Sequence, residues 1–263
     1  MDLRYLHTRI IPPLATIVLN RPEVHNALHI GMIRELSEVF RNLESDPNIH
    51  LVRLTSAGKN FCSGADLSWM REGMNQSKEQ LASESMELAD LFWSLHNSRL
   101  IIVTSVTGKA MGGAIGLIAA SDIVLAEESA RFAFSEVRLG LVPATIAPFA
   151  LRKMGYSRCL ELMVSGRTFT AEMAAQYGLV HHRCEEGMLE ETAEDLLATL
   201  LSNGPEAMRA VKSLLGGLDG GIPRSDVRQL TAELIARHRI SPEGQEGMKA
   251  FFEKRNPRWY ETT

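Results

Sequence analysis

The sequence has few cysteines and no long apolar run. Its three cysteines, Cys62, Cys159 and Cys184, show no CxxC spacing, which is typical of reduced thiols and argues against a disulfide-stapled secreted domain. No stretch resembles a secretory signal or a membrane span. These absences predict a cytoplasmic protein that does not contact a membrane.

Positive charge is not in excess, and metal-binding patterns are missing. The 28 Lys and Arg residues are outnumbered by 32 Asp and Glu residues, which leaves a net charge of −4. A protein without a basic field is a poor candidate for binding nucleic acid. The eight histidines include no HExxH or other metal-ligand spacing, so we expect no metal.

The sequence does contain alternating strand and helix patterns. With 263 residues and 45% hydrophobic content it can form a large buried core. Strands are predicted at 2–11, 14–20, 50–55, 101–106, 123–126 and 179–184. Helices are predicted from Ile33 to Leu43, at 77–97, from Gly113, and at 146–154, 157–164, 170–176, 187–202, 205–215, 223–239 and 242–254, with 56–70 as a loop. The alternation predicts an α/β core at 1–200 with a largely parallel sheet, followed by a helical region at 201–263.

A glycine pair precedes a helix of small residues in this core. Gly112 and Gly113 allow a close backbone approach, and the first N–H groups of a helix have no partner within it. Together with the helix dipole, such N–H groups can stabilise a developing oxyanion. The alternative is that these small residues serve helix packing alone.

Five segments in order resemble the crotonase (enoyl-CoA hydratase/isomerase) superfamily. They are NRPEVHNAL (20–28), GKNFCSGADL (58–67), TGKAMGGAIGL (107–117), TAEMAAQYGLV (170–180) and GMKAFFEKRNP (247–257). The resemblance implies a crotonase-like spiral of ββα units with a C-terminal helical region for trimerisation and for closing the CoA site. It also implies an acyl-CoA substrate, no separate cofactor, and a homotrimer or a hexamer built as a dimer of trimers.

The resemblance also assigns roles to individual residues. It implies backbone N–H groups of Ser63 and Gly113 as donors to the thioester oxygen of an enolate, and Glu136 as the catalytic base and acid. Partial burial beside an apolar segment would suit Glu136 to proton transfer near neutral pH. Contacts to CoA are implied for Val24, His25, Lys59, Ser63, Asp66, Leu67, Gly113, Phe251 and Lys254, the last two reaching a neighbouring subunit.

The chain departs from the family pattern at one position. Hydratases of this family carry a first glutamate where this sequence has Gly116. A single carboxylate favours an isomerase that moves a double bond from the 3- to the 2-position. The run SEVRLGLVPATIAPF (135–149), with glycine at the first position, resembles instead the bacterial methylglutaconyl-CoA and isohexenylglutaconyl-CoA hydratases, so we expect a hydratase.

Other features bear on the substrate. A carboxylated acyl group would need a cation, for which Arg71 and Arg138 are candidates. Trp69, Met70 and Met74 follow the Ser63 loop and could form a cover that accommodates a branched chain, although core packing explains them almost as well. Non-catalytic acyl-CoA binding and dehydration of a carrier-bound thioester remain open alternatives.

Overall fold

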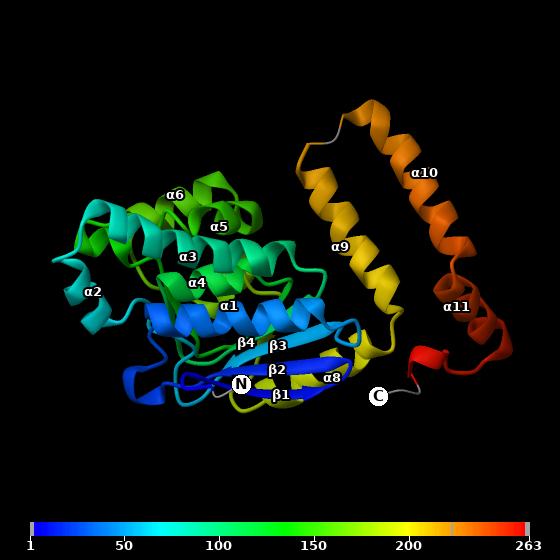
Figure 1. Ribbon diagram of the computed structural model, residues 1–263, viewed down its shortest axis with the longest axis horizontal. Coiled ribbons are helices and arrows are strands. Elements are labelled where there is room, and N and C mark those ends of the chain that lie inside the picture. Colours follow the sequence, from blue (N-terminus) through cyan, green and yellow to red (C-terminus); the bar gives the residue numbers. More distant parts are fainter. Residues whose placement is uncertain (1–2, 222, 261–263) are drawn as a thin grey trace.

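A mixed sheet forms the centre of the computed structural model, which describes residues 3–221 and 223–260 (Figure 1). In this part of the chain the sheet has six strands in the order β1-β2-β3-β4-β6-β9. They are β1 (Leu6–Ile11), β2 (Leu14–Leu19), β3 (Leu51–Ser56), β4 (Ile101–Val106), β6 (Ile123–Glu127) and β9 (His182–Cys184). Only β1 and β2 pair antiparallel among these neighbours. The largely parallel sheet that we predicted is confirmed.

Both faces of this sheet are buried. Val52 and Ile102 join the larger apolar cluster, which includes residues of α1, α3 and α4, whereas Leu51 and Ile101 join a second cluster with α8. Successive side chains of a strand point to opposite faces, and burial of both faces explains why these strands are continuously apolar. Figure 1 shows α1, α3 and α4 layered on one face.

Helices account for most of the remaining chain. The helices are α1 (Ile30–Ser45), α2 (Leu67–Gly73), α3 (Lys78–Asn97), α4 (Gly113–Ala120), α5 (Ala147–Met154), α6 (Tyr156–Ser165), α7 (Ala171–Gln176), α8 (Leu189–Leu201), α9 (Pro205–Asp219), α10 (Arg224–Ile240) and α11 (Pro242–Glu253), with 3-10 segments η1 (Pro22–Val24), η2 (Glu136–Leu139) and η3 (Arg258–Tyr260). The predicted helix start at Gly113 is confirmed. The prediction of a loop throughout 56–70 is wrong at its end, because Asp66 accepts a hydrogen bond from Ser68 N–H and so caps α2.

A second, smaller sheet was not predicted. It has the order β5-β7-β8 in the described part of the chain, with β5 (Lys109–Met111), β7 (Arg131–Ala133) and β8 (Phe169–Thr170). Strands of two or three residues are too short to show a periodic pattern. The sheet joins the glycine turn to the chain that leads to Glu136, because Gly112 N–H donates to the Ala133 carbonyl at 2.9 Å.

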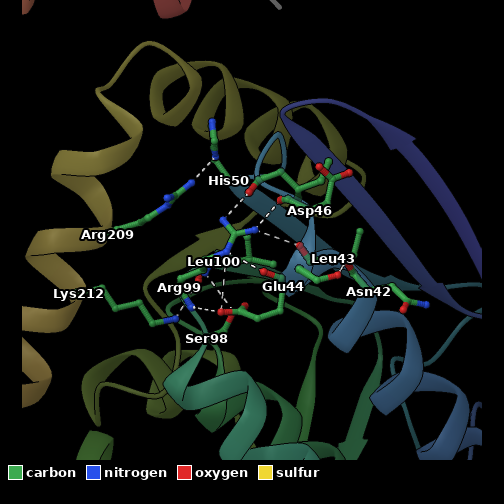
Figure 2. Close-up of polar contacts among 12 residues, drawn as sticks. Asn42, Leu43, Glu44, Asp46, His50, Ser98, Arg99, Leu100, Arg209 and Lys212 are labelled. Atoms are coloured by element: carbon green, nitrogen blue, oxygen red, sulfur yellow. Dashed lines mark hydrogen bonds and ion pairs between the residues drawn. The ribbon is translucent and has the colours of Figure 1, made fainter. Parts of the chain in front are cut away.

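The C-terminal helices form an arm. Figure 1 shows α10 and α11 standing away from the sheet, while α9 connects them to it. Polar contacts fasten α9: Lys212 Nζ lies 2.8 Å from Asp122 Oδ2, and Arg209 Nη2 lies 2.8 Å from His50 Nδ1 (Figure 2). The arm corresponds to the helical region predicted for 201–263, of which 222 and 261–263 lie outside the described residues. Its role in trimerisation stays a prediction.

Beside this junction, one arginine fixes the end of α1. The Arg99 guanidinium donates to the carbonyl oxygens of Leu43, Glu44 and Asp46 (Figure 2). These carbonyls belong to the last turn of α1 and to Asp46, the residue that ends it. Helix carbonyls there lack intrahelical partners, and a cation is favoured. The contact therefore secures α1 to the start of β4.

Candidate active site

Loops that follow parallel strands meet at one edge of the sheet. β2 ends at Leu19 opposite Ser56, the end of β3, so the loops after these strands lie side by side. The loop after β3 also reaches the segment before α4, because Cys62 N–H donates to the Lys109 carbonyl and Met111 N–H donates to the Cys62 carbonyl. This edge is where open α/β sheets usually bind ligands.

Asn26 holds two of these loops together. It is fully buried and adopts a left-handed conformation with φ of 55°. Its side chain accepts from Arg21 N–H and donates to the carbonyls of Ala57 and Asn60. The amide group thus joins the loop after β2 to the loop after β3. The sequence reading did not single out Asn26, although an asparagine among turn residues is a known sign of left-handed backbone.

Asp66 contributes to the same framework. It is 6% exposed, pairs with Arg21 at 2.8 Å and accepts from Ser68 N–H. Although burial acts to raise the pKa of Asp66, hydrogen bonds from Ser68 and Arg21 lower it to about 2. Both oxygens of the carboxylate are engaged within the protein, and the contact of Asp66 with CoA stays a prediction.

The backbone amide assigned to Ser63 is not free. Ser63 N–H donates to the His25 carbonyl at 3.0 Å, so the prediction that this group serves as an oxyanion donor is wrong. Ala65 is placed differently. Leu28 pairs with both neighbours of Ala65, since Leu28 N–H donates to the Gly64 carbonyl and Asp66 N–H donates to the Leu28 carbonyl.

In such a parallel bridge the amide of the residue opposite Leu28 points to the other side. Ala65 is exposed there, and no acceptor contacts its N–H within residues 3–221 and 223–260. The direction of this amide follows from pairing with a distant segment, which the sequence does not display.

Gly113 offers a second backbone donor nearby. As the first residue of α4 its N–H has no partner in the helix. A Cβ on Gly113 would lie 3.1 Å from Leu28 Cδ1, and one on Gly64 would lie 3.9 Å from Gly112 Cα. The segments of Ala65 and Gly113 are therefore adjacent, and their two N–H groups can stabilise a negatively charged oxygen.

The Glu136 carboxyl group lies against the glycine turn. A Cβ on Gly112 would sit 3.0 Å from Glu136 Oε1, and Gly112 has a φ of +52° that favours glycine. Glu136 Oε2 is buried without a hydrogen-bond partner among the described residues. Burial raises the pKa of Glu136 above the usual value. A half-buried carboxyl group with an unpaired oxygen is suited to take up and release a proton.

The position of the absent first glutamate is filled. Any Cβ on Gly116 would overlap the ring of Phe92, which is fully buried in α3 and packs edge-on against Phe149. The ring of Phe92 therefore occupies the space that a glutamate side chain at position 116 would enter. Glu136 is left as the carboxyl group at the turn.

The predicted CoA contacts fall into two groups. Val24, His25, Lys59 and Leu67 are exposed on the loops around Ala65. Phe251, 79% exposed, and Lys254 lie at the end of α11, at the far end of the molecule from α2 in Figure 1. One chain therefore does not bring these two residues to its own site.

Apolar side chains are exposed on the segments that follow Ala65 and Glu136 in the chain. Leu67 and Met74 of the α2 segment are 79% and 84% exposed, and Leu139, Leu141 and Val142 beyond Glu136 are also exposed. Arg71 and Arg138 are exposed. Within the described ranges no group of three or more His, Cys, Asp or Glu side chains could hold a metal. None of the described helices is both long and apolar enough to cross a membrane.

Comparisons with known proteins agree on one family. Residues 12–262 match the family model described as enoyl-CoA hydratase/isomerase. A putative enoyl-CoA hydratase of Thermus thermophilus is 34% identical over 246 residues, which covers 94% of this chain and 97% of that protein. Mevalonyl-coenzyme A hydratase sidH of Aspergillus fumigatus is 28% identical over 253 residues, 94% of this chain and 92% of that protein. The crystal structure of an enoyl-CoA hydratase from Shewanella pealeana superposes with a TM-score of 0.93 at 40% identity, covering 98% of this chain and 97% of that one.

Proposed function

Because the chain belongs to the enoyl-CoA hydratase/isomerase family, we propose that it adds water to the double bond of an α,β-unsaturated acyl-CoA, with Glu136 moving the protons. The crotonase-like α/β fold expected from the motifs is confirmed. One observation carries the proposal. The buried, unpaired Glu136 Oε2 lies beside a turn that presents backbone donors.

The donors and the carboxyl group divide the reaction between them. The thioester oxygen of the substrate accepts from the N–H groups of Ala65 and Gly113, which stabilise the enolate. Removing one such donor from an enzyme typically costs about 3–4 kcal/mol of transition-state stabilisation. The oxygen that becomes negative is thereby held where the helix dipole of α4 also favours it.

A single carboxylate can complete the hydration by relay. Ionised Glu136 takes a proton from water while the hydroxyl oxygen adds to C3, and the electron pair moves to the thioester oxygen. Glu136 then returns the proton to C2 as the enolate collapses. The raised pKa of Glu136 supports both steps, because an acid and base of intermediate strength exchanges protons readily.

Isomerisation is the second candidate, and the Gly116–Phe92 contact favours it. With the ring of Phe92 against Gly116, no second carboxylate helps to position the water. Moving a double bond from C3 to C2 needs one base only, which lifts a proton from C2 and returns it at C4. The relatives that carry the name hydratase support the first candidate.

We further propose a branched acyl group for the substrate. Mevalonyl, in the name of one relative, is a branched group, and the motif resemblance to methylglutaconyl-CoA hydratases points the same way. Arg71 and Arg138 are exposed on the segments that follow Ala65 and Glu136 in the chain, and neither has an ion-pair partner among the described residues. Either guanidinium could pair with a carboxylate on the acyl chain.

CoA and a second subunit complete the proposed site. Val24, His25, Lys59 and Leu67 contact CoA bound to their own chain, and Phe251 and Lys254 contact CoA bound to a neighbour. The exposed apolar residues of the arm, which include Ile235, Ile240 and Phe252, support assembly into a homotrimer or a hexamer.

The test is loss of the absorbance of the conjugated enoyl thioester with crotonyl-CoA and with 3-methylglutaconyl-CoA. Wild type is compared with Glu136→Gln and with Glu172→Gln, an exposed carboxylate of α7. Loss that only Glu136→Gln abolishes supports hydration. No loss, but a gain of absorbance from a 3-enoyl-CoA, makes the protein an isomerase. Binding of acyl-CoA without either change contradicts both candidates.

A further inference from the structure

Helix α2 is an exposed element that begins at the proposed oxyanion donor. None of its residues is buried, and it projects at the edge of the molecule opposite the arm (Figure 1). It starts two residues after Ala65, and its capping residue Asp66 is held by Arg21. The orientation of α2 is therefore coupled to the peptide that carries the Ala65 N–H.

One carboxylate of α3 holds this helix at two points. Glu84 Oε2 accepts from Trp69 Nε1 of α2 at 2.7 Å. Glu84 Oε1 accepts from Gln76 Nε2, in the connection between α2 and α3, at 3.0 Å. Hydrogen bonds to both oxygens of one carboxyl group restrict the middle of α2 and the chain that follows it.

The Gln76 side chain shows that this connection depends on Glu84. Its Oε1 is buried without a partner among the described residues. Turning the amide would satisfy that oxygen no better, since Oε1 would then face the carboxylate oxygens of Glu84. A buried acceptor without a donor is costly, so the contact with Glu84 is what keeps Gln76 in this arrangement.

The α2 segment presents apolar side chains beside its polar ones. Leu67 and Met74 are the most exposed apolar side chains of this segment, and Met70 lies between them. Unbranched, polarizable methionine side chains adapt to apolar ligands of varied shape. Trp69 packs against the core cluster and so connects this surface to the body of the protein.

We propose that Glu84 is a positioning residue that holds α2 as one wall of the acyl-binding part of the site, so that the size of the acyl group accepted depends on the Trp69–Glu84–Gln76 contacts. The inference rests on the proposed acyl-CoA function. Glu84 acts through Trp69 and Gln76, and it contacts neither substrate nor the reacting atoms.

Two variants loosen α2 in different ways. Glu84→Ala removes both contacts, and Trp69→Phe removes one donor while it keeps an aromatic ring. The matched control is Glu87→Ala, one turn further along α3, where the carboxylate pairs with Arg34 of α1 instead.

The first readout is the rate of tryptic cleavage after Arg71, an exposed residue of α2. We expect cleavage to rise about tenfold in both variants and not in the control, since it needs local opening.

The second readout separates positioning from a general loss of stability. In Glu84→Ala, for a long acyl-CoA substrate such as 2-dodecenoyl-CoA, we expect KM to rise about tenfold. In the same variant kcat for crotonyl-CoA stays within about twofold, because only binding of the acyl chain is lost. Unchanged cleavage after Arg71 would overturn the inference. So would faster cleavage with unchanged KM for the long substrate, which would place α2 outside the acyl site.

A failure of the proposed reaction remains distinguishable from a failure of this inference. Calorimetric titration with dodecanoyl-CoA and with acetyl-CoA measures binding without turnover. If the wild type turns over no thioester, a selective loss of dodecanoyl-CoA affinity in Glu84→Ala still supports the role of Glu84. Equal affinities in wild type, both variants and the control would overturn it.

Discussion

Gly116 of α4 lies directly against the ring of Phe92 of α3, with no room for a Cβ between them. The two residues share one buried space, so changes to them should not be additive. We expect Gly116→Glu to destabilise the fold by about 3 kcal/mol or more, because it overpacks the core and buries a carboxylate. Phe92→Ala alone should cost about 3–5 kcal/mol through the cavity that it leaves.

Urea unfolding of both single variants and of the double variant measures the coupling. If the glutamate occupies the space of the ring, the double variant is more stable than the sum of the single effects by about 1–3 kcal/mol. Simple additivity would contradict the shared space. The same double variant, assayed with crotonyl-CoA, reports whether a restored carboxylate assists hydration.

Gly112→Ala should damage catalysis more than stability. The added Cβ would meet Glu136 Oε1 at 3.0 Å, and a shift of a catalytic group by about 1 Å can cost about 100-fold in rate. Gly155→Ala is the control, since Gly155 also has a positive φ of 77° but a Cβ there meets nothing within 4 Å. Both variants should lose about 1–3 kcal/mol of stability from backbone strain, and Gly112→Ala alone should lose kcat. Equal kcat values would show that Glu136 tolerates the contact.

The stability of the protein should depend on the ionisation of Glu136. Burial raises its folded-state pKa, so its contribution to stability is fully present below the usual glutamate value of 4.5 and is lost as the pH rises through the folded value. Glu136→Gln keeps the neutral shape and does not ionise. We expect the free energy of unfolding of this variant to exceed that of wild type by about 0.5–2 kcal/mol at pH 8. The difference should be smaller at pH 4. A difference that grows on acidification would contradict a raised pKa.

The junction of the arm should weaken in acid. Burial and the neighbouring Arg209 and Arg99 hold the pKa of His50 below its usual 6.5, against the opposing effects of a hydrogen bond to the Ile49 backbone and the charge of Glu206. The contribution of neutral His50 to stability is therefore present above about pH 6.5, and it is lost as the pH falls through the folded-state pKa of His50. Relative to His50→Gln, wild type should lose about 1 kcal/mol between pH 8 and pH 5, the size of one hydrogen bond.

Thermal unfolding across this pH range measures the loss, and hydrogen exchange of α9 locates it. In Arg209→Ala the partner of His50 Nδ1 is gone, so His50→Gln should change the pH dependence of stability less in this variant than in wild type. An equal effect of His50→Gln in both proteins would show that the His50–Arg209 contact is not the cause.

Local sequence patterns predicted most strands of the central sheet and most helices correctly. The apolar runs of β3, β4 and β6 identify buried strands, because both faces of the sheet are covered and no polar alternation survives. Gly113 marks the start of α4, as predicted. Thr170, the first residue of the helix predicted at 170–176, caps α7 by accepting from Met173 N–H, a position that threonine favours. The strands β5, β7 and β8 escaped prediction, since pairs and triplets of residues carry too little periodicity.

By itself the sequence determined the longer helices and strands, where the glycine turn precedes α4, and that Glu136 and not residue 116 carries the carboxylate. Only the tertiary structure decided that Ala65 and not Ser63 directs a free N–H toward the site, and that Phe92 fills the space over Gly116. The physical reason is the same in both cases. The direction of an amide and the space open to a side chain depend on segments distant in the chain, Leu28 for one and α3 for the other, and no local pattern encodes such contacts.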